Sequence, residues 1–367
     1  MDVWQGTVED LGVVMSQKIS KDFWAGKRVF VTGHTGFKGS WMCLWLKSLG
    51  AIVSGFSLEP STSPNLFTEA KVSNDMASVI GDVRDFNALY NALESYKPEI
   101  VIHMAAQPLV GLSYIEPVET YATNVMGTVH VLEAVRQINT VKVVINVTTD
   151  KCYENKEWPW GYRENEAIGG HDPYSSSKGC SELVTSAYRN SFLTDQKVMI
   201  ASARAGNVIG GGDWTLGRLI PDMLSSFNRS EPVMIRNPVA TRPWQHVLEP
   251  LSGYLMLAEK LYQYGSDYAE AWNFGPKDDD ARSVEWIAKK LCKQWGVGAA
   301  WEVDGISHPH EANFLKLDIS KAKSKLGWQP KTRLEQTLSD IVKWHKRWIN
   351  KESARDLCLE EIQNFLH

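Results

Sequence analysis

Short runs of apolar and β-branched residues alternate with longer stretches of helical periodicity through the first two hundred positions of the chain. The short runs predict strands, over residues 28–32, 51–56, 78–80, 100–103, 141–147 and 197–203. The longer stretches predict helices, over residues 37–49, 86–96, 119–137 and 174–190. Strands and helices that alternate in this way form a parallel sheet with helices on both faces, which predicts an α/β fold with a Rossmann-like, doubly wound sheet.

The regular alternation of strands and helices ends after the sixth predicted strand. The glycines at 210–212 open a segment of short elements interrupted by prolines, and a helical tail is expected from Ser283. We therefore expect an N-terminal arm over 1–23, a main domain over 24–205 and a smaller C-terminal α/β lobe over 206–367. Part of that lobe is expected to return to the main domain.

Composition and charge favour a small molecule as the partner of this chain. The 367 residues carry 39 Lys and Arg against 43 Asp and Glu, a formal net charge of -4 without a long run of one sign, which argues against nucleic acid. No apolar run reaches the roughly 18 residues of a membrane span, and the first residues lack the pattern of a signal peptide, so a cytoplasmic protein is expected. Five cysteines without a C-x-x-C spacing indicate neither a disulfide framework nor a metal site.

A glycine-rich loop follows the first predicted strand and opens the first predicted helix. Gly33, Gly36 and Gly39 have the spacing G-x-x-G-x-x-G, which allows a tight turn, close approach of the backbone to a pyrophosphate, and close packing of helix on strand. A simple turn is the alternative, but the flanking strand and helix favour dinucleotide binding. Glu59 near the end of the second strand, where no arginine stands, favours NAD over NADP. Lys38 either neutralises phosphate charge or is a solvated lysine.

Tyr174 and Lys178 open a predicted helix and lie four residues apart, so they share one helix face. An ammonium near a phenol lowers the pKa of the phenol toward that of a usable base. About half a match to this spacing is expected by chance among twelve tyrosines. The order along the chain makes the pair more than chance, because it follows the glycine-rich loop and a strand that ends in the polar residues 148–151.

Three motifs make the chain resemble a known family. They are GHTGFKG at 33–39, TTDKCYENKEWPWGYREN at 148–165 and AGNVIGGGDW at 205–214. Over almost everything after residue 24, the chain resembles the nucleotide-sugar 4,6-dehydratases of the extended short-chain dehydrogenase/reductase family, and among them the enzymes that act on CDP-glucose. The resemblance implies a lyase that uses NAD, takes CDP-glucose as its nucleotide-sugar substrate and serves deoxysugar synthesis for surface polysaccharide such as O-antigen.

The resemblance also implies a three-stage reaction on the sugar. Tyr174, as phenolate, takes the proton of the C4 hydroxyl while hydride passes from C4 to NAD, and Thr149 hydrogen-bonds the C4 oxygen. A base then removes the C5 proton while Asp150 protonates the C6 hydroxyl, which leaves as water. Hydride finally returns to C6, giving the 4-keto-6-deoxy sugar. Lys178 lowers the pKa of Tyr174 and holds the nicotinamide ribose.

Lys151 departs from the pattern of many sugar-nucleotide dehydratases, which carry a glutamate there as the C5 base. Desolvation and nearby positive charges would favour the neutral lysine that a base requires. The enzymes that act on CDP-glucose resemble this chain at that position, which supports Lys151 as the base. It could instead stabilise an enolate, or pair with Asp150 as an ordinary strand-end lysine, and the three roles stay open.

Strand ends and the resemblance together give two sets of binding residues. We expect the cofactor to contact Gly33, Thr35, Gly36, Phe37, Lys38, Gly39, Asp82, Val83, Ala105, Ala106, Gln107, Asn124, Thr148, Tyr174, Lys178 and Arg204. A sugar diphosphate needs cationic donors, and the arginine fork suits it. We expect the substrate to contact Asn207, Arg218, Leu219, Ile235, Arg236, Arg242 and His310. A surface charge paired with a neighbouring acid is the alternative for these arginines.

The oligomeric state and the competing functions are also expectations. The resemblance implies that helices 119–137 and 174–190 pair with their twins across a two-fold axis, so we expect a homodimer, with a tetramer as the alternative. A nucleotide-sugar 4-epimerase would share Tyr174 and Lys178 but lack an acid and a base beside Thr149. A nucleotide-binding sensor without turnover would have no reason to keep these side chains together.

Overall fold

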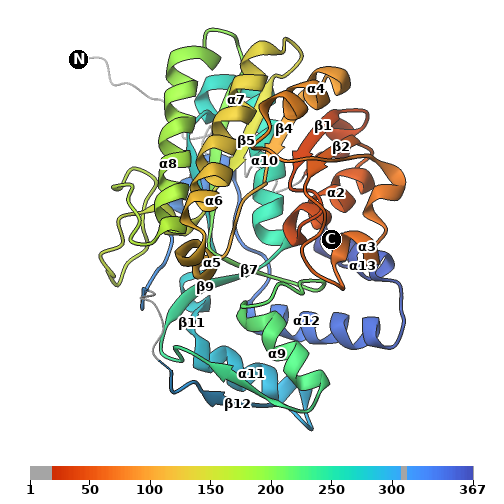
Figure 1. Cartoon of the computed structure of the whole chain (residues 1–367), viewed down its shortest axis with the longest axis vertical. Coiled ribbons are helices and arrows are strands. Elements are labelled where there is room, and N and C mark those ends of the chain that lie inside the picture. The colour runs from red at the N-terminus through yellow and green to blue at the C-terminus, as the bar shows by residue number, and fades with distance from the viewer. Residues whose placement is uncertain (1–18, 307–311, 367) are drawn as a thin grey trace, which may run out of the picture.

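The computed structural model describes residues 19–306 and 312–366, and its centre is a parallel sheet (Figure 1). The seven strands of this sheet are β1 (Arg28–Thr32), β2 (Ile52–Ser57), β3 (Ala77–Ile80), β4 (Ile100–His103), β5 (Val143–Val147), β6 (Met199–Ala205) and β10 (Ala271–Phe274). Their order is β10-β6-β5-β4-β1-β2-β3, and each neighbouring pair is parallel. The predicted α/β fold with a Rossmann-like sheet is confirmed.

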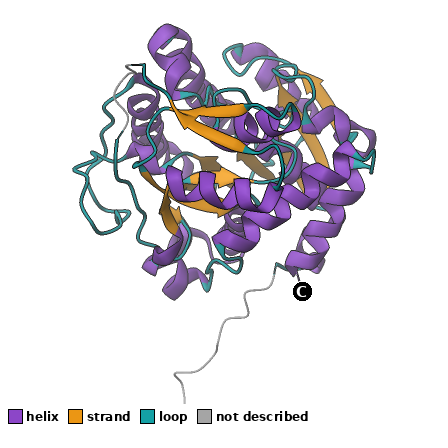
Figure 2. Cartoon of the chain, turned by 90° about the horizontal axis from the view of Figure 1, so that it is seen from below, coloured by secondary structure: helices purple, strands orange, loops and turns teal. Residues whose placement is uncertain are grey.

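Side chains alternate across the sheet and build an apolar core on each face. Val29 and Val31 of β1 join one core, whereas Phe30 between them joins the other, because successive strand residues point to opposite faces. The first core lies under α2 (Phe37–Ser48), α10 (Leu248–Tyr264) and α13 (Ala354–Leu366). The second lies under α4 (Phe86–Tyr96), α7 (Gly127–Gln137) and α8 (Pro173–Tyr188). Figure 2 shows helices above and below the strands.

Shorter helices complete the main domain: α1 (Lys21–Trp24), α3 (Leu66–Glu69), α5 (Val110–Ile115) and α6 (Pro117–Tyr121). The helix expected over 119–137 is divided into α6, a π-helical turn at 122–126 and α7. A second π-helical turn at 189–193 continues α8. The four helices expected over 37–49, 86–96, 119–137 and 174–190 thus lie within a few residues of their predicted positions, whereas α1, α3 and α5 were not predicted.

Beyond β6 the described residues form two small sheets packed with helices, while α10, α13 and β10 return to the main sheet. Strands β7 (Asn207–Ile209), β9 (Thr241–His246) and β11 (Ala281–Ser283) form one sheet, and β8 (Pro232–Ile235) and β12 (Ala300–Val303) the other. They pack with α9 (Leu219–Asn228), α11 (Val284–Trp295) and α12 (Leu334–Ile349) around a third core. The helical tail expected from Ser283 is present as α11, α12 and α13, but it is interrupted. Gly296, with a φ of 96°, ends α11, and β12 follows before α12 begins.

The arrangement of the sheet places a crevice at a defined point. The chain leaves β1 toward β2 and β3 on one side, and β4, β5 and β6 lie on the other, so the strand order reverses between β1 and β4. Ligands of open α/β sheets bind at the carboxyl ends of the strands near such a reversal. In Figure 1 the elements α9, α11, β9 and β11 lie below the sheet at that end.

Candidate active site

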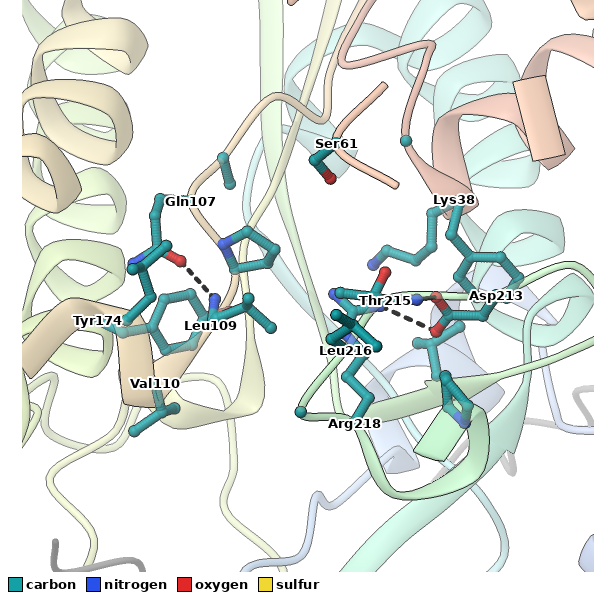
Figure 3. A pocket seen from close by; sticks show the side chains of 18 of the residues that line it. Lys38, Ser61, Gln107, Leu109, Val110, Tyr174, Asp213, Thr215, Leu216 and Arg218 are labelled. Carbon is teal, nitrogen blue, oxygen red and sulfur yellow. Dashed lines mark hydrogen bonds and ion pairs between the residues drawn. The ribbon is translucent and has the colours of Figure 1, made fainter. Parts of the chain in front are cut away.

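A cavity of about 990 Å³ lies at the carboxyl ends of the central strands, where the C-terminal lobe faces the sheet (Figure 3). Most of the predicted site residues line it: Gly33, Thr35, Gly36, Phe37, Lys38, Gly39, Asp82, Val83, Ala105, Ala106, Gln107, Thr148, Thr149, Asp150, Lys151, Tyr174, Asn207, Arg218, Leu219, Ile235, Arg236 and Arg242. Asn124, Lys178 and Arg204 do not line this cavity, and His310 lies outside the described residues. The fold therefore brings the two predicted binding sets to one place.

The glycine-rich loop has the geometry of a phosphate cradle. Gly33 has a φ of 76°, and a Cβ there would lie 2.8 Å from the backbone nitrogen of Ala105. A Cβ on Gly39 would overlap the carbonyl oxygen of Gly33, so neither position accepts a side chain. No side chain caps the first turn of α2 after Gly36, which leaves its N–H groups available to an anion. These residues fit the pyrophosphate of a dinucleotide.

The ends of β2, β3 and β4 supply the other wall of the predicted cofactor site. Glu59 lines the cavity beyond β2. Asp82, beyond β3, accepts a hydrogen bond of 2.8 Å from Arg84, and this bond lowers the pKa of the carboxyl. Asn124 is buried, and its side-chain oxygen accepts the N–H of Gln107 at 2.9 Å. Asn124 thus holds the loop after β4 in place without lining the cavity itself.

Thr149 and Asp150 stand at the end of the central strand β5. Thr149 Oγ1 donates a hydrogen bond of 3.0 Å to one carboxylate oxygen of Asp150, and the other oxygen is buried without a partner among the described residues. Asp150 is only 2% exposed, and burial raises its pKa although Lys151, Thr149 and Arg242 oppose that rise. A carboxyl in such a place tends to hold a proton, as a general acid must.

Tyr174 and Lys178 lie on one face of α8, as predicted, and both are buried. Burial raises the pKa of Tyr174 to about 12, although a side-chain hydrogen bond between Tyr174 and Thr149 lowers it. Burial also lowers the pKa of Lys178 to about 8. The Lys178 ammonium donates to the Val147 carbonyl at 3.3 Å. That Lys178 lowers the Tyr174 pKa stays a prediction.

A buried network that the sequence analysis missed lies directly behind Lys178. Glu182, one turn further along α8, accepts hydrogen bonds from Thr148 Oγ1, from Ser202 Oγ at 2.6 Å and from Arg204 at 2.8 Å. Its negative charge raises the pKa of Lys178 against the effect of burial. Arg204, predicted at the cofactor, donates instead to the Tyr153 hydroxyl at 2.8 Å and to a backbone carbonyl. The spacing Lys178-x-x-x-Glu182 was the signal available in the sequence.

The predicted substrate arginines lie on the opposite wall. Arg218 forms an ion pair of 3.1 Å with Asp213, a residue of the AGNVIGGGDW motif that the sequence analysis did not single out. Arg236 donates to the Gly217 carbonyl at 3.3 Å, and Arg242 to the Thr241 carbonyl at 3.0 Å. The electrostatic effect of Arg242 on the Asp150 pKa places its charge near the reaction centre.

Four tryptophans from segments with many glycines and prolines separate into two pairs, and one of them, Trp244, lies in strand β9. Trp214 and Trp244 line the cavity, whereas Trp158 and Trp160 do not. Trp158 stacks on Tyr162 with ring centroids 5.7 Å apart, at the outside of the molecule. The loop that carries them thus covers the protein rather than the described cavity.

Two further features bear on the class of site. Within residues 19–306 and 312–366, no group of three or more His, Cys, Asp and Glu side chains is arranged to hold a metal ion. The helices of that same part of the chain include none that is long and apolar enough to cross a membrane.

Comparison with known proteins agrees with this geometry. The model of the GDP-mannose 4,6-dehydratase family matches residues 30–341. The CDP-glucose 4,6-dehydratase of Salmonella typhimurium is 58% identical over 353 residues, 95% of this chain and 98% of the relative. The human dTDP-D-glucose 4,6-dehydratase is 27% identical, with 89% and 93% covered.

A solved structure shares the fold at lower identity. It is dTDP-glucose 4,6-dehydratase from Bacillus anthracis in complex with NAD, with a TM-score of 0.73, 21% identity, and 90% of this chain and 100% of that chain covered. The family match and the relative from Salmonella confirm the resemblance inferred from the three motifs. The chain belongs to the nucleotide-sugar 4,6-dehydratases, the family that the GDP-mannose 4,6-dehydratase model describes.

Proposed function

We propose that this enzyme dehydrates CDP-D-glucose to CDP-4-keto-6-deoxy-D-glucose with NAD as its cofactor. The observation that carries the proposal is the meeting of Thr149, Asp150 and Tyr174 with a glycine-rich dinucleotide cradle in one cavity. The choice of CDP-glucose is supported by the 58% identical relative, which is named for that substrate. Bound NAD supplies the two-electron oxidation at C4 and the matching reduction at C6.

The side chains at the end of β5 and the start of α8 divide the proton transfers. Tyr174 takes the C4 hydroxyl proton, and its neighbour Thr149 holds the C4 oxygen. Asp150, whose pKa is raised by burial, delivers the proton that lets the C6 hydroxyl leave as water. Lys151 lines the cavity beside Asp150 and is the proposed C5 base. Lys178 holds the nicotinamide ribose from the face of α8 that it shares with Tyr174.

The two binding sets define the sides of the cavity. We assign the cofactor to the loops after β1, β3 and β4 and the substrate diphosphate to Arg218 and Arg242. Asn124 and Arg204 are assigned supporting roles behind the cofactor site, since neither lines the cavity. Residues 24–205 thus carry mainly the cofactor, and residues 206–367 mainly the substrate.

The assembly and setting of the enzyme belong to the same proposal. A homodimer through α7 and α8 is supported by exposed apolar side chains on or beside them, among them Met126, Leu183 and Phe192 at 46%, 61% and 45% exposure. Five free cysteines are typical of a reducing compartment, which supports the cytoplasm. The product class would serve deoxysugar synthesis for surface polysaccharide.

Turnover with four substrates tests the proposal. The protein with NAD is incubated separately with CDP-, dTDP-, UDP- and GDP-glucose, and each nucleotide sugar is followed by mass spectrometry. Loss of one water from CDP-glucose alone is the expected result. Water loss from another nucleotide sugar instead would overturn the choice of nucleotide, and none from any of the four, with NAD demonstrably bound, would overturn the activity.

A further inference from the structure

Lys38 occupies an unusual place for a lysine. It is the second residue of α2, in the glycine-rich loop, and its side chain lines the cavity (Figure 3). Its ammonium lies 5.7 Å from the ring centroid of Tyr254, whose buried hydroxyl has no partner among the described residues. None of the residues that the structure describes forms a hydrogen bond or an ion pair with this ammonium. Within the described residues, no ion pair therefore neutralises its positive charge.

Other cations surround the same space. Repulsion from Lys178 and Arg218 adds to burial in lowering the pKa of Lys38 to about 7, and Asp150 is the charge that opposes this shift. Figure 3 shows Arg218 on the same side of the cavity as Lys38, and Asp213 pairs with only one nitrogen of its guanidinium. Like charges that lie close together raise the free energy of the empty cavity, and a bound anion would lower it. The two cations therefore indicate an anion site beside them.

We propose that Lys38 and Arg218 together clamp the diphosphate of the nucleotide-sugar substrate, so that the cofactor loop is also part of the substrate site. This inference rests on the proposed function for the identity of the substrate. The diphosphate of NAD has its own donors in the free N–H groups of the first turn of α2. The Lys38 side chain instead reaches charges of the reaction centre and of the substrate wall, namely Asp150, Lys178 and Arg218.

Calorimetric titration of the NAD-loaded protein with CDP, CMP and cytidine tests the clamp. Lys38→Met should weaken CDP by about 10- to 100-fold, the effect of removing one hydrogen bond to a charged group, and should change cytidine by less than about threefold. Lys38→Arg should recover most of the CDP affinity. Lys47→Met removes a lysine from the other end of the same helix, away from the cavity lining, and should leave CDP binding unchanged.

Separate measurements distinguish the two diphosphates. With NAD as the titrant, Lys38→Met should change the dissociation constant by less than about threefold, and in turnover KM for CDP-glucose should rise while kcat stays within about threefold. Equal CDP affinity of wild type and Lys38→Met, or a loss confined to NAD, would overturn the clamp. A wild type that binds CDP through Lys38 but dehydrates nothing would overturn the proposed function and leave the clamp standing.

Protection of the unaltered enzyme gives a result even if Lys38→Met does not fold. Acetic anhydride modifies exposed amines, and mass spectrometry reads the modification at Lys38. CDP should protect Lys38 in the NAD-loaded enzyme, whereas cytidine should not. If NAD alone already protects Lys38 completely from modification, or if CDP gives no protection, the ammonium does not bind the substrate diphosphate and the clamp is overturned.

Discussion

Two arginine–carboxylate pairs near the carboxyl ends of the central strands share the same chemistry and differ in their surroundings. The Arg204–Glu182 pair spans 2.8 Å, with side chains only 4% and 5% exposed. The Arg218–Asp213 pair spans 3.1 Å, and the Arg218 side chain is 31% exposed. The first pair is enclosed by other protein groups, while the second stands in the wall of the cavity. An enclosed ion pair holds the surrounding protein groups in position, whereas an accessible guanidinium can still bind a ligand.

The difference separates the two halves of the site. On the cofactor side, glycine backbone shapes the loop after β1, and a buried network of Glu182, Thr148 and Arg204 lies behind Lys178. On the substrate side, the partly exposed guanidinium of Arg218 stands in the wall of the cavity. One half thus provides geometry and the other provides available charge, and substitutions in the two halves should differ in what they damage.

Tyr174→Phe should have the largest effect and should damage chemistry alone. Loss of the phenol oxygen removes the group that takes the C4 proton, so kcat should fall by about 10²- to 10⁴-fold. CDP affinity and the unfolding transition should stay near wild type, because the ring that fills the site is kept. Steady-state turnover of CDP-glucose measures the loss. Tyr90→Phe, which removes a hydroxyl bonded to Glu94 at the surface, is the control and should turn over normally.

Glu182→Gln should damage stability first. Breaking one partner of a buried pair leaves the Arg204 charge uncompensated and costs about 3–5 kcal/mol of the free energy of unfolding. The Lys178 pKa should also fall further, since the carboxylate that raises it is gone. Urea unfolding measures the stability, and the pH profile of kcat the second effect. Glu285→Gln, which breaks a surface pair with Lys289, should cost less than about 0.5 kcal/mol.

Arg218→Gln should damage substrate binding and spare the fold. KM for CDP-glucose should rise by about 10- to 100-fold because a charged donor to the diphosphate is lost. The free energy of unfolding should change by less than about 1 kcal/mol, since the pair is partly exposed to solvent. Kinetics and urea unfolding are measured on the same preparation. If Arg218→Gln lowers the free energy of unfolding as much as Glu182→Gln does, the proposed difference between the two ion pairs is wrong.

The free energy of unfolding should depend on pH through two buried histidines of the main domain. Burial lowers the pKa of His34 to about 4 and that of His103 to about 3. Neutral imidazoles in the folded state contribute stability that is fully present above the ordinary histidine pKa of about 6.5 and is lost as the pH falls toward the folded values. Urea unfolding across that range should show the decline. His34→Asn should reduce its slope, and an unchanged slope would contradict the role of that histidine.

The sequence was sufficient for features that depend on local pattern. The glycine spacing, the Tyr174 and Lys178 pair and the alternation of strands and helices each have a short-range physical signature, and the structure places them together. Partners that meet only in the fold were missed. Arg204 bonds Glu182 and Tyr153, which approach it from separate segments of the chain, and its expected contact with the cofactor stays a prediction.

Strand β10 gives the folding of this enzyme an order in time. It is made long after β6, its neighbour in the sheet, and Asn273 within it binds the Tyr153 hydroxyl at 2.7 Å and the Tyr162 carbonyl at 2.8 Å. Until the ribosome has delivered β10, the nascent sheet has an open edge at β6 and the loop beyond β5 lacks its anchor. The sheet of the cofactor half is therefore complete only once the C-terminal half of the polypeptide has supplied β10.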